Sequence, residues 1–398
     1  MRLTKFLLLS ILVISIRFFC FVPYQLSGYG NIVEMLAILC LVYIFVFGRG
    51  EKSKKLIFKR DVVCLIILPF FSAIPCLLYH NQSLFDSLIA TRYVLFWLVY
   101  FALHKGSLTT DSIIKIILAI GLISAFVYFF QQITYPEYYL FDTPDIIKRE
   151  IEIRSGLYRF RLFPLNPYIL FAFFFYLCES IERRTAKKWI YTLILLLSIY
   201  LTLTRQLWFC VAISAFMYPL VYENALNGKK IVTIAISLCL LYILYSNLGN
   251  IIGTELITQT KDQFENEDDV RVGSYLFYGL QYWNDLFNIL FGNGVPFTGR
   301  TAYAAEIEAY QDTLHMYRSD IGIVGQFSMY GLLYVASFAM LYIHLIRNFR
   351  YLSTYLKLII IMTIINIPLG SWDSYPLFMG IFLFIAENDI KKNKSLSV

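Results

Sequence analysis

Long apolar runs alternate with polar segments along the whole chain. Twelve of these runs are predicted spans, most of them close to the roughly 17–22 residues that cross a bilayer as a helix, and the last one is short. They fall at 3–22, 30–48, 61–79, 88–104, 112–133, 164–181, 189–204, 206–222, 231–252, 320–346, 356–370 and 375–387. The pattern predicts an all-α, polytopic integral membrane protein with about 12 transmembrane helices. We expect one membrane domain over residues 1–398, with two long outer loops at 134–163 and 253–319.

The composition agrees with a membrane protein. The 398 residues are 59% hydrophobic and only 15% charged, which is far from the balance of a soluble domain. The first apolar run contains Arg17 and lacks a small-x-small cleavage site, so it is predicted to be a signal anchor. All seven cysteines lie inside predicted spans, which predicts neither a disulfide framework nor a thiolate metal site.

Basic residues set the predicted orientation. They cluster at 49–60, 182–188, 229–230, 347–357 and 391–394. These segments share one side if the chain has twelve spans and both termini are cytoplasmic, as the positive-inside rule requires. The sequence therefore predicts a multi-pass protein of a cytoplasmic membrane, with its two long loops on the outer face.

Most basic residues predicted on the outer face and in the spans are arginines. The two lysines there are Lys148 and Lys261. The arginines are Arg17, Arg92, Arg149, Arg154, Arg159, Arg161, Arg205, Arg271, Arg300 and Arg318. The planar guanidinium fork binds phosphate oxygens in a bidentate way, which lysine does not. The bias predicts a phosphorylated substrate, and Arg17, Arg92 and Arg205 are candidates to line one anionic cavity. The alternative is that arginine is simply favoured in the headgroup zone, where its side chain snorkels.

The first long loop ends in Arg159-Phe160-Arg161. In an extended segment the side chains alternate, so both guanidiniums point to the same side. Two forks on one side form a candidate pyrophosphate clamp. Salt bridges to Glu150 and Glu152 are the alternative interpretation.

The second long loop begins with a solvated acidic stretch and continues as an aromatic segment over 270–292. That segment is too interrupted to span a bilayer, which favours a helix at the interface or over a cavity. Its aromatic side chains offer flat faces to sugar rings, and membrane anchoring explains them equally well. They are Tyr275, Tyr278, Tyr282 and Trp283.

A predicted helix over 300–320 carries the candidate catalytic group. Tyr303, Ile307, Tyr310, Leu314 and Tyr317 recur at helical spacing and form a stripe expected to pack. His315 lies three residues from both Asp312 and Arg318, so the three share a face if the helix continues. A histidine oriented by a carboxylate is a candidate general base. An ordinary surface pair is the alternative.

Other residues complete the set of outer candidates. His80 is the second histidine of the predicted outer side, and Asp373 is a spare carboxylate between the last two spans. Ser319 and Asp320 are expected to cap the helix that follows. Small residues recur there every three positions and are expected to let helices approach closely. They are Gly322, Gly325, Ser328 and Gly331.

Several motifs are absent from the sequence. It contains no glycine-rich nucleotide loop, no His-x-x-x-His pair and no paired Asp-x-Asp motif in the outer loops. We therefore expect no cofactor and metal-independent chemistry, with arginines providing the charge stabilisation.

Taken together, these features resemble the bacterial O-antigen polymerases and the related O-antigen ligases. The resemblance covers roughly residues 120–345 and consists of short motifs. They are Leu203-Thr204-Arg205-Gln206-Leu207-Trp208, Arg159-Phe160-Arg161-Leu162-Phe163-Pro164, Arg271, the Gly292-Asn293-Gly294 turn, and His315 before Gly322-x-x-Gly325. One departure concerns His315, because the ligases place Asn or a similar polar residue after the histidine and this chain has Met316.

The resemblance implies a glycosyltransferase of the bacterial inner membrane that acts at its periplasmic face. Such an enzyme transfers a glycan from undecaprenyl pyrophosphate to an acceptor sugar hydroxyl, with no metal and no nucleotide sugar. By this resemblance His315, Asp312 and Arg271 are catalytic, and Arg159, Arg161, Arg205, Arg300 and Arg318 bind the substrate. The implied partners are the lipid-linked oligosaccharide and, beside it, a chain-length regulator and a flippase, and no nucleic acid is involved.

Three other functions stay open. A ligase transfers finished polymer to the lipid A core, and the Met316 departure weakens that alternative. A flippase or other transporter favours internal repeats and midplane charges, and no repeat between the two halves is visible. A non-enzymatic assembly factor would not require the arginine bias.

Overall fold

The computed structural model describes most of the chain, and its helices follow the predicted apolar runs. The described residues are 2–15, 21–22, 29–48, 56–106, 108–136, 139–140, 153–154, 156–160, 162, 165–222, 270–368, 370 and 375–396. The predicted span at 231–252, the acidic stretch at 253–269 and the amphipathic piece at 145–152 lie outside these residues. So do Arg17, Lys148, Arg149, Arg161, Lys261 and Asp373.

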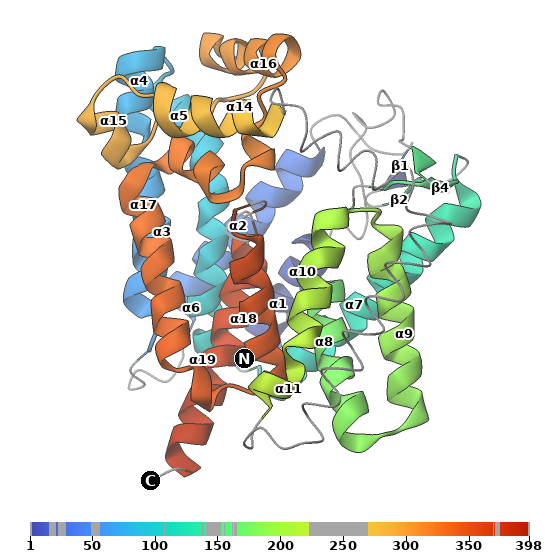
Figure 1. Ribbon diagram of the computed structural model, residues 1–398. Helices are drawn as coiled ribbons and strands as arrows, with labels where there is room; N and C mark the ends of the chain where they lie inside the picture. Colours follow the sequence, from blue (N-terminus) through green and yellow to red (C-terminus); the bar gives the residue numbers. More distant parts are fainter. Residues whose placement is uncertain are drawn as a thin grey trace.

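The protein is a bundle of helices (Figure 1). The first half contains α1 (Arg2–Ser15), α2 (Tyr29–Phe47), α3 (Lys59–Phe71), α4 (Ala73–His80), α5 (Leu84–Thr91), the 3₁₀ helix η1 (Arg92–Trp97), α6 (Leu98–Lys105), α7 (Thr110–Thr134), α8 (Asn166–Arg183), α9 (Ala186–Leu201), α10 (Arg205–Phe216) and α11 (Tyr218–Val221). The second half contains α14 (Val270–Leu276), the π-helical η4 (Phe277–Gln281), α15 (Leu286–Phe291), α16 (Ala302–Leu314), the 3₁₀ helix η5 (Arg318–Asp320), α17 (Gly322–Arg347), the 3₁₀ helix η6 (Phe349–Tyr351), α18 (Thr354–Asn366) and α19 (Pro376–Leu396).

Strands are minor in the described residues. Two antiparallel ladders of two residues each pair β1 (Phe21–Val22) with β2 (Tyr139–Leu140), and β3 (Ile153–Arg154) with β4 (Leu157–Tyr158). The second ladder is a hairpin within the first long outer loop, just before Arg159.

Four stretches of helix are long and apolar enough to cross a membrane. They are Lys59–His80, Leu84–Lys105, Thr110–Thr134 and Gly322–Arg347. Shorter apolar helices cover Glu34–Phe47, Arg205–Phe216 and Thr354–Asn366. The all-α class is therefore confirmed and these helices are compatible with a membrane protein, whereas the number of twelve spans stays a prediction.

Besides the kink at Gly331 in Gly322–Arg347, where φ is 79° and ψ is 178°, two of the four stretches contain a break that the apolar pattern does not reveal. Pro69 lies in the last turn of α3, and Ser72 separates α3 from α4. The other stretch passes from α5 through six residues of 3₁₀ helix at Arg92–Trp97 into α6. Arg92 lies at this break, where its guanidinium binds Glu34 of α2 at 3.1 Å. It therefore has a carboxylate partner within the bundle.

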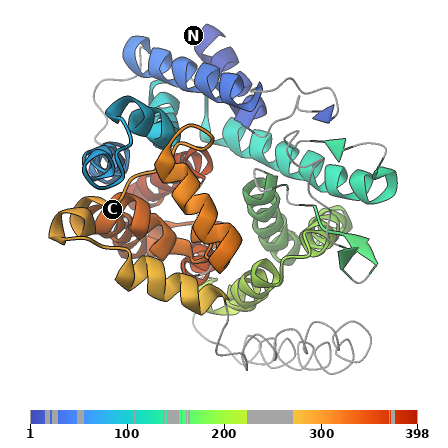
Figure 2. The ribbon, with the colours of Figure 1, turned by 90° about the horizontal axis from the view of Figure 1, so that it is seen from above.

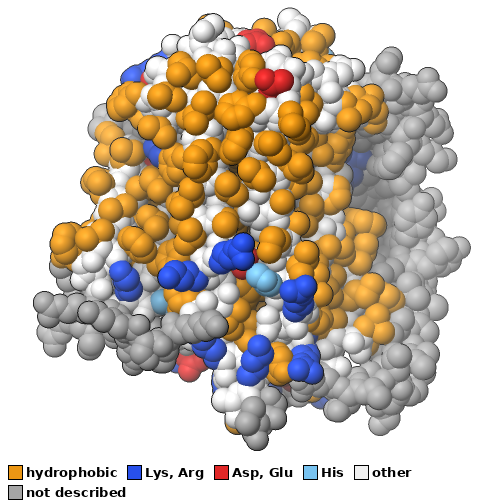
Figure 3. Space-filling model, turned by 90° about the vertical axis from the view of Figure 1, so that its left-hand side faces the viewer, with side chains coloured by type: hydrophobic (Ala, Val, Ile, Leu, Met, Phe, Trp, Pro, Cys, Tyr) orange, Lys and Arg blue, Asp and Glu red, His pale blue; other side chains and the backbone are white. Residues whose placement is uncertain are grey.

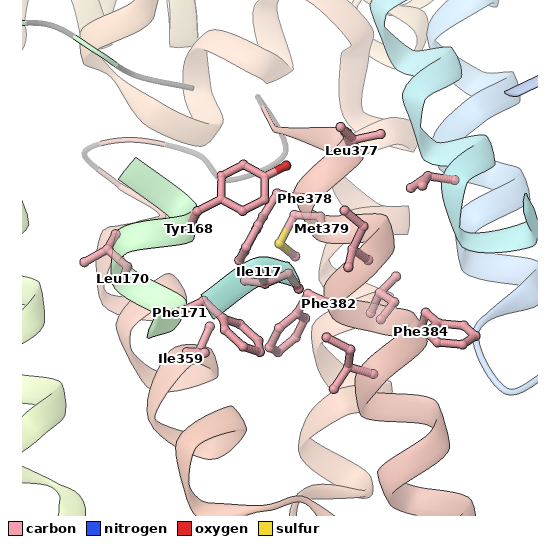
Figure 4. Close-up of a cluster of buried hydrophobic side chains, with 14 of the residues drawn as sticks. Ile117, Tyr168, Leu170, Phe171, Ile359, Leu377, Phe378, Met379, Phe382 and Phe384 are labelled. Carbon is pink, nitrogen blue, oxygen red and sulfur yellow. The ribbon is translucent and has the colours of Figure 1, made fainter. Parts of the chain in front are cut away.

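The main core lies where α7, α8, α18 and α19 meet. Ile117, Phe171, Ile359 and Phe378 come from these four helices and point toward one another (Figure 4). Close approach is possible because Gly121 of α7 lies against the backbone of α8. A Cβ atom at Gly121 would lie 2.7 Å from the carbonyl oxygen of Tyr168.

Two of the small residues lie against other backbone segments, although Gly331 kinks α17, and the predicted cap does not form. A Cβ atom at Gly322 would lie 2.2 Å from the carbonyl oxygen of Ile367, and one at Gly331 would lie 2.4 Å from the amide nitrogen of Gly292. The residue before α17 is Ile321, which offers no side-chain hydrogen bond, because Ser319 and Asp320 belong to the 3₁₀ turn η5.

The two ends of the bundle differ in character. Helices α4, α5, α14, α15 and α16 gather at the upper end in Figure 1, and both chain ends lie toward the lower end. On the side of α3 and α17, Lys and Arg side chains form a band along the lower edge of a wide apolar surface (Figure 3). An ion pair of 2.8 Å between Asp61 and His344 joins these two helices near that edge.

Candidate functional site

The aromatic segment of the second long loop folds over the upper end of the bundle. It forms α14, η4 and α15, and the capping box of Asp285 starts α15 through hydrogen bonds to the amides of Phe287 and Asn288. Gly292 and Gly294 have positive φ angles of 84° and 79°, which a glycine adopts without strain. The turn predicted at Gly292-Asn293-Gly294 therefore exists. It places Asn293 against α4.

Arg318 lies at the centre of this assembly, in a box of tyrosine rings. Its Cζ atom lies 4.9 Å from the ring centre of Tyr278, 5.0 Å from that of Tyr282 and 5.7 Å from that of Tyr303. Its Nη2 donates a hydrogen bond of 3.0 Å to the Tyr303 hydroxyl. The residue is only 7% exposed. One buried cation thus joins η4, α16 and the start of α17.

The tyrosines of this box remain neutral. Burial raises the pKa of Tyr303, and burial likewise raises the pKa of Tyr282. Burial and the hydrogen bond to Glu306 raise the pKa of Tyr310 to about 12. The charge of Arg318 is therefore met by aromatic faces, which attract a desolvated cation by about 2 kcal/mol.

His80 is held beside the box with both ring nitrogens engaged. Its ring stacks on Tyr303 with ring centres 4.0 Å apart. Nε2 lies 3.4 Å from Oδ1 of Asn293, and Nδ1 lies 3.6 Å from Oε2 of Glu306. Oδ1 of Asn293 also accepts a hydrogen bond from the side chain of Asn288. Nδ2 of Asn293 donates to the carbonyl of Tyr282. Asn293 is thus oriented as an acceptor, so Nε2 of His80 carries a proton.

Glu306 is the accessible member of this pair. Its side chain is 40% exposed, whereas that of His80 is 9% exposed. The Tyr310 hydroxyl donates to its other oxygen, Oε1, at 2.8 Å. His80 and Glu306 thus form a pair of titratable groups, of which the carboxylate is the solvent-accessible member.

Two predicted phosphate ligands, Arg205 and Arg271, belong to helices that contact the end of α18. Arg205 begins α10, and the next residue, Gln206, donates to Asn366 Oδ1 at 2.6 Å. Arg271 lies in α14, one turn before Tyr275, whose hydroxyl donates to the carbonyl of Pro368. The helices that carry Arg205 and Arg271 thus both contact the end of α18, at Asn366 and at Pro368.

The predicted helical face of His315 does not form. Helix α16 ends at Leu314, and His315 is its C-cap in the left-handed conformation with φ 53°. His315 and Asp312 are exposed, whereas Arg318 turns inward into the tyrosine box. The predicted stripe is buried only at Tyr303 and Ile307. Leu314 is 51% exposed, because the chain leaves the helix there.

The segment after His315 nevertheless packs on the helix that carries Arg271. The hydroxyl of Tyr278 donates to the carbonyl of Met316 at 3.4 Å. The amide of Tyr317 donates to the hydroxyl of Ser274 at 3.2 Å. His315 therefore lies beside α14, although neither Asp312 nor a shared helix turn orients it.

The remaining predicted arginines lie elsewhere on the upper end. Arg159 is half-buried and follows the hairpin, and the next residue, Phe160, is buried. Its presumed partner in the clamp, Arg161, lies outside the described residues. Arg300 is exposed and lies 5.3 Å from the ring centre of Phe297. Seen from above, the segment from α8 to α10 lies between the hairpin and helices α14 to α16 (Figure 2).

The His80–Glu306 pair was not predicted from the sequence. The two residues are 226 positions apart, and His80 follows an ordinary apolar run. The only sequence signal was that His80 is the second histidine predicted on the outer face. Its neighbours come from a loop folded back over α4, which spacing alone does not reveal.

Replacing Arg318 by alanine is expected to lower the stability of the protein by about 2 kcal/mol or more, because the cation joins three rings. The melting temperature of the purified protein in detergent, followed by intrinsic fluorescence, measures this effect. Arg300→Ala is the matched control, because Arg300 is exposed and faces a single ring. Equal melting temperatures for the two variants would show that Arg318 does not hold the loop helices together.

The described part of the chain holds no group of three or more His, Cys, Asp and Glu side chains placed to bind a metal ion. The sequence matches no family model, no curated protein and no solved structure. The fold alone therefore defines the class, an all-helical protein with helices long and apolar enough to cross a membrane.

Proposed function

We propose that the protein is a membrane glycosyltransferase that polymerises surface polysaccharide repeat units, in the manner of the O-antigen polymerases it resembles. The donor is a glycan on undecaprenyl pyrophosphate. The acceptor sugar hydroxyl attacks the anomeric carbon, the bond from that carbon to the pyrophosphate oxygen breaks, and the hydroxyl proton passes to a base. The reaction takes place at the upper end of the bundle, which this proposal assigns to the periplasmic face.

The observation that carries the proposal is the position of Arg205 and Arg271. They belong to helices α10 and α14, and both helices contact the end of α18, through Gln206 on Asn366 and Tyr275 on Pro368. In this proposal the two guanidinium forks bind one leaving group with several anionic oxygens. Charge stabilisation of this kind is often the largest contribution to group transfer.

The proton acceptor in this proposal is the His80–Glu306 pair. A base oriented by a second group is the usual arrangement for activating a hydroxyl. Glu306 is the exposed carboxylate of the pair, and the hydroxyl of Tyr310 donates to its other oxygen. His315, the base predicted from the sequence, lies beside α14 and is the alternative acceptor.

The surface polysaccharide of a deletion strain tests the function. Loss of a polymerase is expected to leave single repeat units on the final anchor, and the wild-type gene is expected to restore the ladder on a gel. Full-length polymer stranded on its carrier lipid would instead indicate a ligase. Repeat units that accumulate on the cytoplasmic leaflet would indicate a flippase and would contradict the proposed catalytic roles.

A further inference from the structure

A cavity of about 480 Å³ opens at the lower end of the bundle, away from the site described above. Its walls come from the end of α8, the end of α11, the start of α18 and the C-terminal part of α19. A volume of this size is typical of sites for small molecules or headgroups. The polar side chains in its wall include Glu179, Glu182, Ser353, Lys357 and Asn393.

Lys357 is a buried cation in the wall of this cavity. It is only 5% exposed, yet its ammonium group makes no ion pair or hydrogen bond with any residue that the structure describes. The ammonium nitrogen lies 5.8 Å from the ring centre of Phe349, a cation–π contact. Burying a charge without a partner is costly, which indicates that an anion belongs beside Lys357.

The start of α18 adds to this preference for an anion. Thr354 and Tyr355 line the cavity, and they form the first turn of the helix. The N–H groups of a first turn have no acceptor within their own helix, and the helix dipole is positive there. Asp389 accepts bonds from the amide and hydroxyl of Ser353 at the edge of this turn.

The acidic side of the cavity carries one carboxylate without a partner. Glu179 is neutralised, because it binds Arg183 at 3.2 Å and Lys188 at 3.1 Å. Glu182 makes no ion pair or hydrogen bond with the described residues, and it is exposed at the cavity mouth. The cavity therefore presents one unpaired cation inside and one unpaired anion outside.

We propose that this cavity binds a zwitterion in which a phosphate and a primary ammonium group are adjacent, as in the phosphoethanolamine headgroup of a phospholipid. The phosphate pairs with Lys357 and the first turn of α18. The ammonium pairs with Glu182. A glycerol headgroup, which carries the phosphate without the ammonium, satisfies Lys357 only.

The surroundings of the cavity favour a lipid as the source of this headgroup. Helix α9 packs on α8 and exposes Trp189 and Ile190 at 47% and 56%. Exposed tryptophan next to Lys187 and Lys188 is typical of the level where a membrane meets water. Lys357 lies one turn inside α18, and Glu182 lies in the last turn of α8. The phosphate is thus the deeper group, as it is in a bilayer.

Lipid retention by the purified full-length protein tests this inference, which is independent of the transferase proposal. The protein is equilibrated in detergent with equal amounts of phosphatidylethanolamine and phosphatidylglycerol, and bound lipid is measured by mass spectrometry. The wild type is expected to retain phosphatidylethanolamine about tenfold better than phosphatidylglycerol, because the ammonium adds one charge-assisted hydrogen bond to Glu182. Glu182→Gln should abolish this preference, and Lys357→Met should lower retention of both lipids.

Two controls keep the outcome clear. Lys187→Met removes a lysine at the same level that does not line the cavity, and it should bind like the wild type. The melting temperature of each variant is measured, and Glu182→Gln carries the test if Lys357→Met does not fold.

Displacement of the lipid by glycerophosphoethanolamine at equal concentration would support a soluble zwitterion as the ligand. An unchanged lipid preference in Glu182→Gln would overturn the proposal.

Discussion

Replacing Arg271 or Arg205 by lysine is expected to reduce polymer formation by about tenfold or more, although the positive charge is kept. Lysine is a point charge and cannot bind two phosphate oxygens with a planar fork. Losing one charge-assisted hydrogen bond in the transition state costs about 1.5–3 kcal/mol, and each 1.4 kcal/mol lowers the rate about tenfold. The polysaccharide ladder of a complemented deletion strain measures the effect.

The controls for these variants use the opposite end of the protein. Arg350 is exposed on η6 at the lower end, so Arg350→Lys applies the same substitution away from the proposed site. Its ladder should equal that of the wild type, and immunoblots should show equal protein levels. Near-normal polymer from both Arg271→Lys and Arg205→Lys would rule out the two residues as phosphate ligands.

The apolar pattern predicted the helices well because each run has to be buried or placed in lipid. Helix α7 and helix α17 lie where runs 112–133 and 320–346 predicted them. The breaks were not predictable in the same way. The 3₁₀ segment that begins at Arg92 is uniformly apolar after its first residue, and the partner of that arginine, Glu34, comes from another helix.

For the candidate site, the sequence predicted which types of residue take part but not how they are arranged. Arginine bias identified Arg205 and Arg271, but the contact of both their helices with the end of α18 follows from tertiary packing. The helical spacing of Asp312, His315 and Arg318 was misleading, because the left-handed conformation of His315 ends the helix first. Spacing describes contacts within one element, whereas the tyrosine rings around Arg318 come from η4, its C-cap and α16.

Arg318 connects the packing of the loop helices with the position of His80. The same tyrosine rings that surround its guanidinium also stack on His80, so the cation and the His80–Glu306 pair share Tyr282 and Tyr303. Removing Arg318 is therefore expected to lower polymer formation indirectly, by displacing His80. For this reason the histidines themselves provide the sharper test of the chemistry.

Replacing His80 by phenylalanine is expected to lower polymer formation by about 100-fold or more, the range that general base catalysis contributes. Phenylalanine keeps a flat ring between Tyr282 and Tyr303, so the stacking is preserved while both ring nitrogens are lost. The melting temperature should therefore stay close to that of the wild type. The polysaccharide ladder and the melting curve are measured on the same variant.

His315→Asn is the matched comparison for this variant. Asparagine tolerates the left-handed conformation of residue 315, so the end of α16 is kept and only the imidazole is removed. If the His80–Glu306 pair accepts the proton, polymer is expected to persist in His315→Asn and to disappear in His80→Phe. The opposite pattern would assign the base to His315, as the sequence alone predicted. It would also reduce His80 to a packing residue, because its ring, preserved in phenylalanine, would then be all that the site requires.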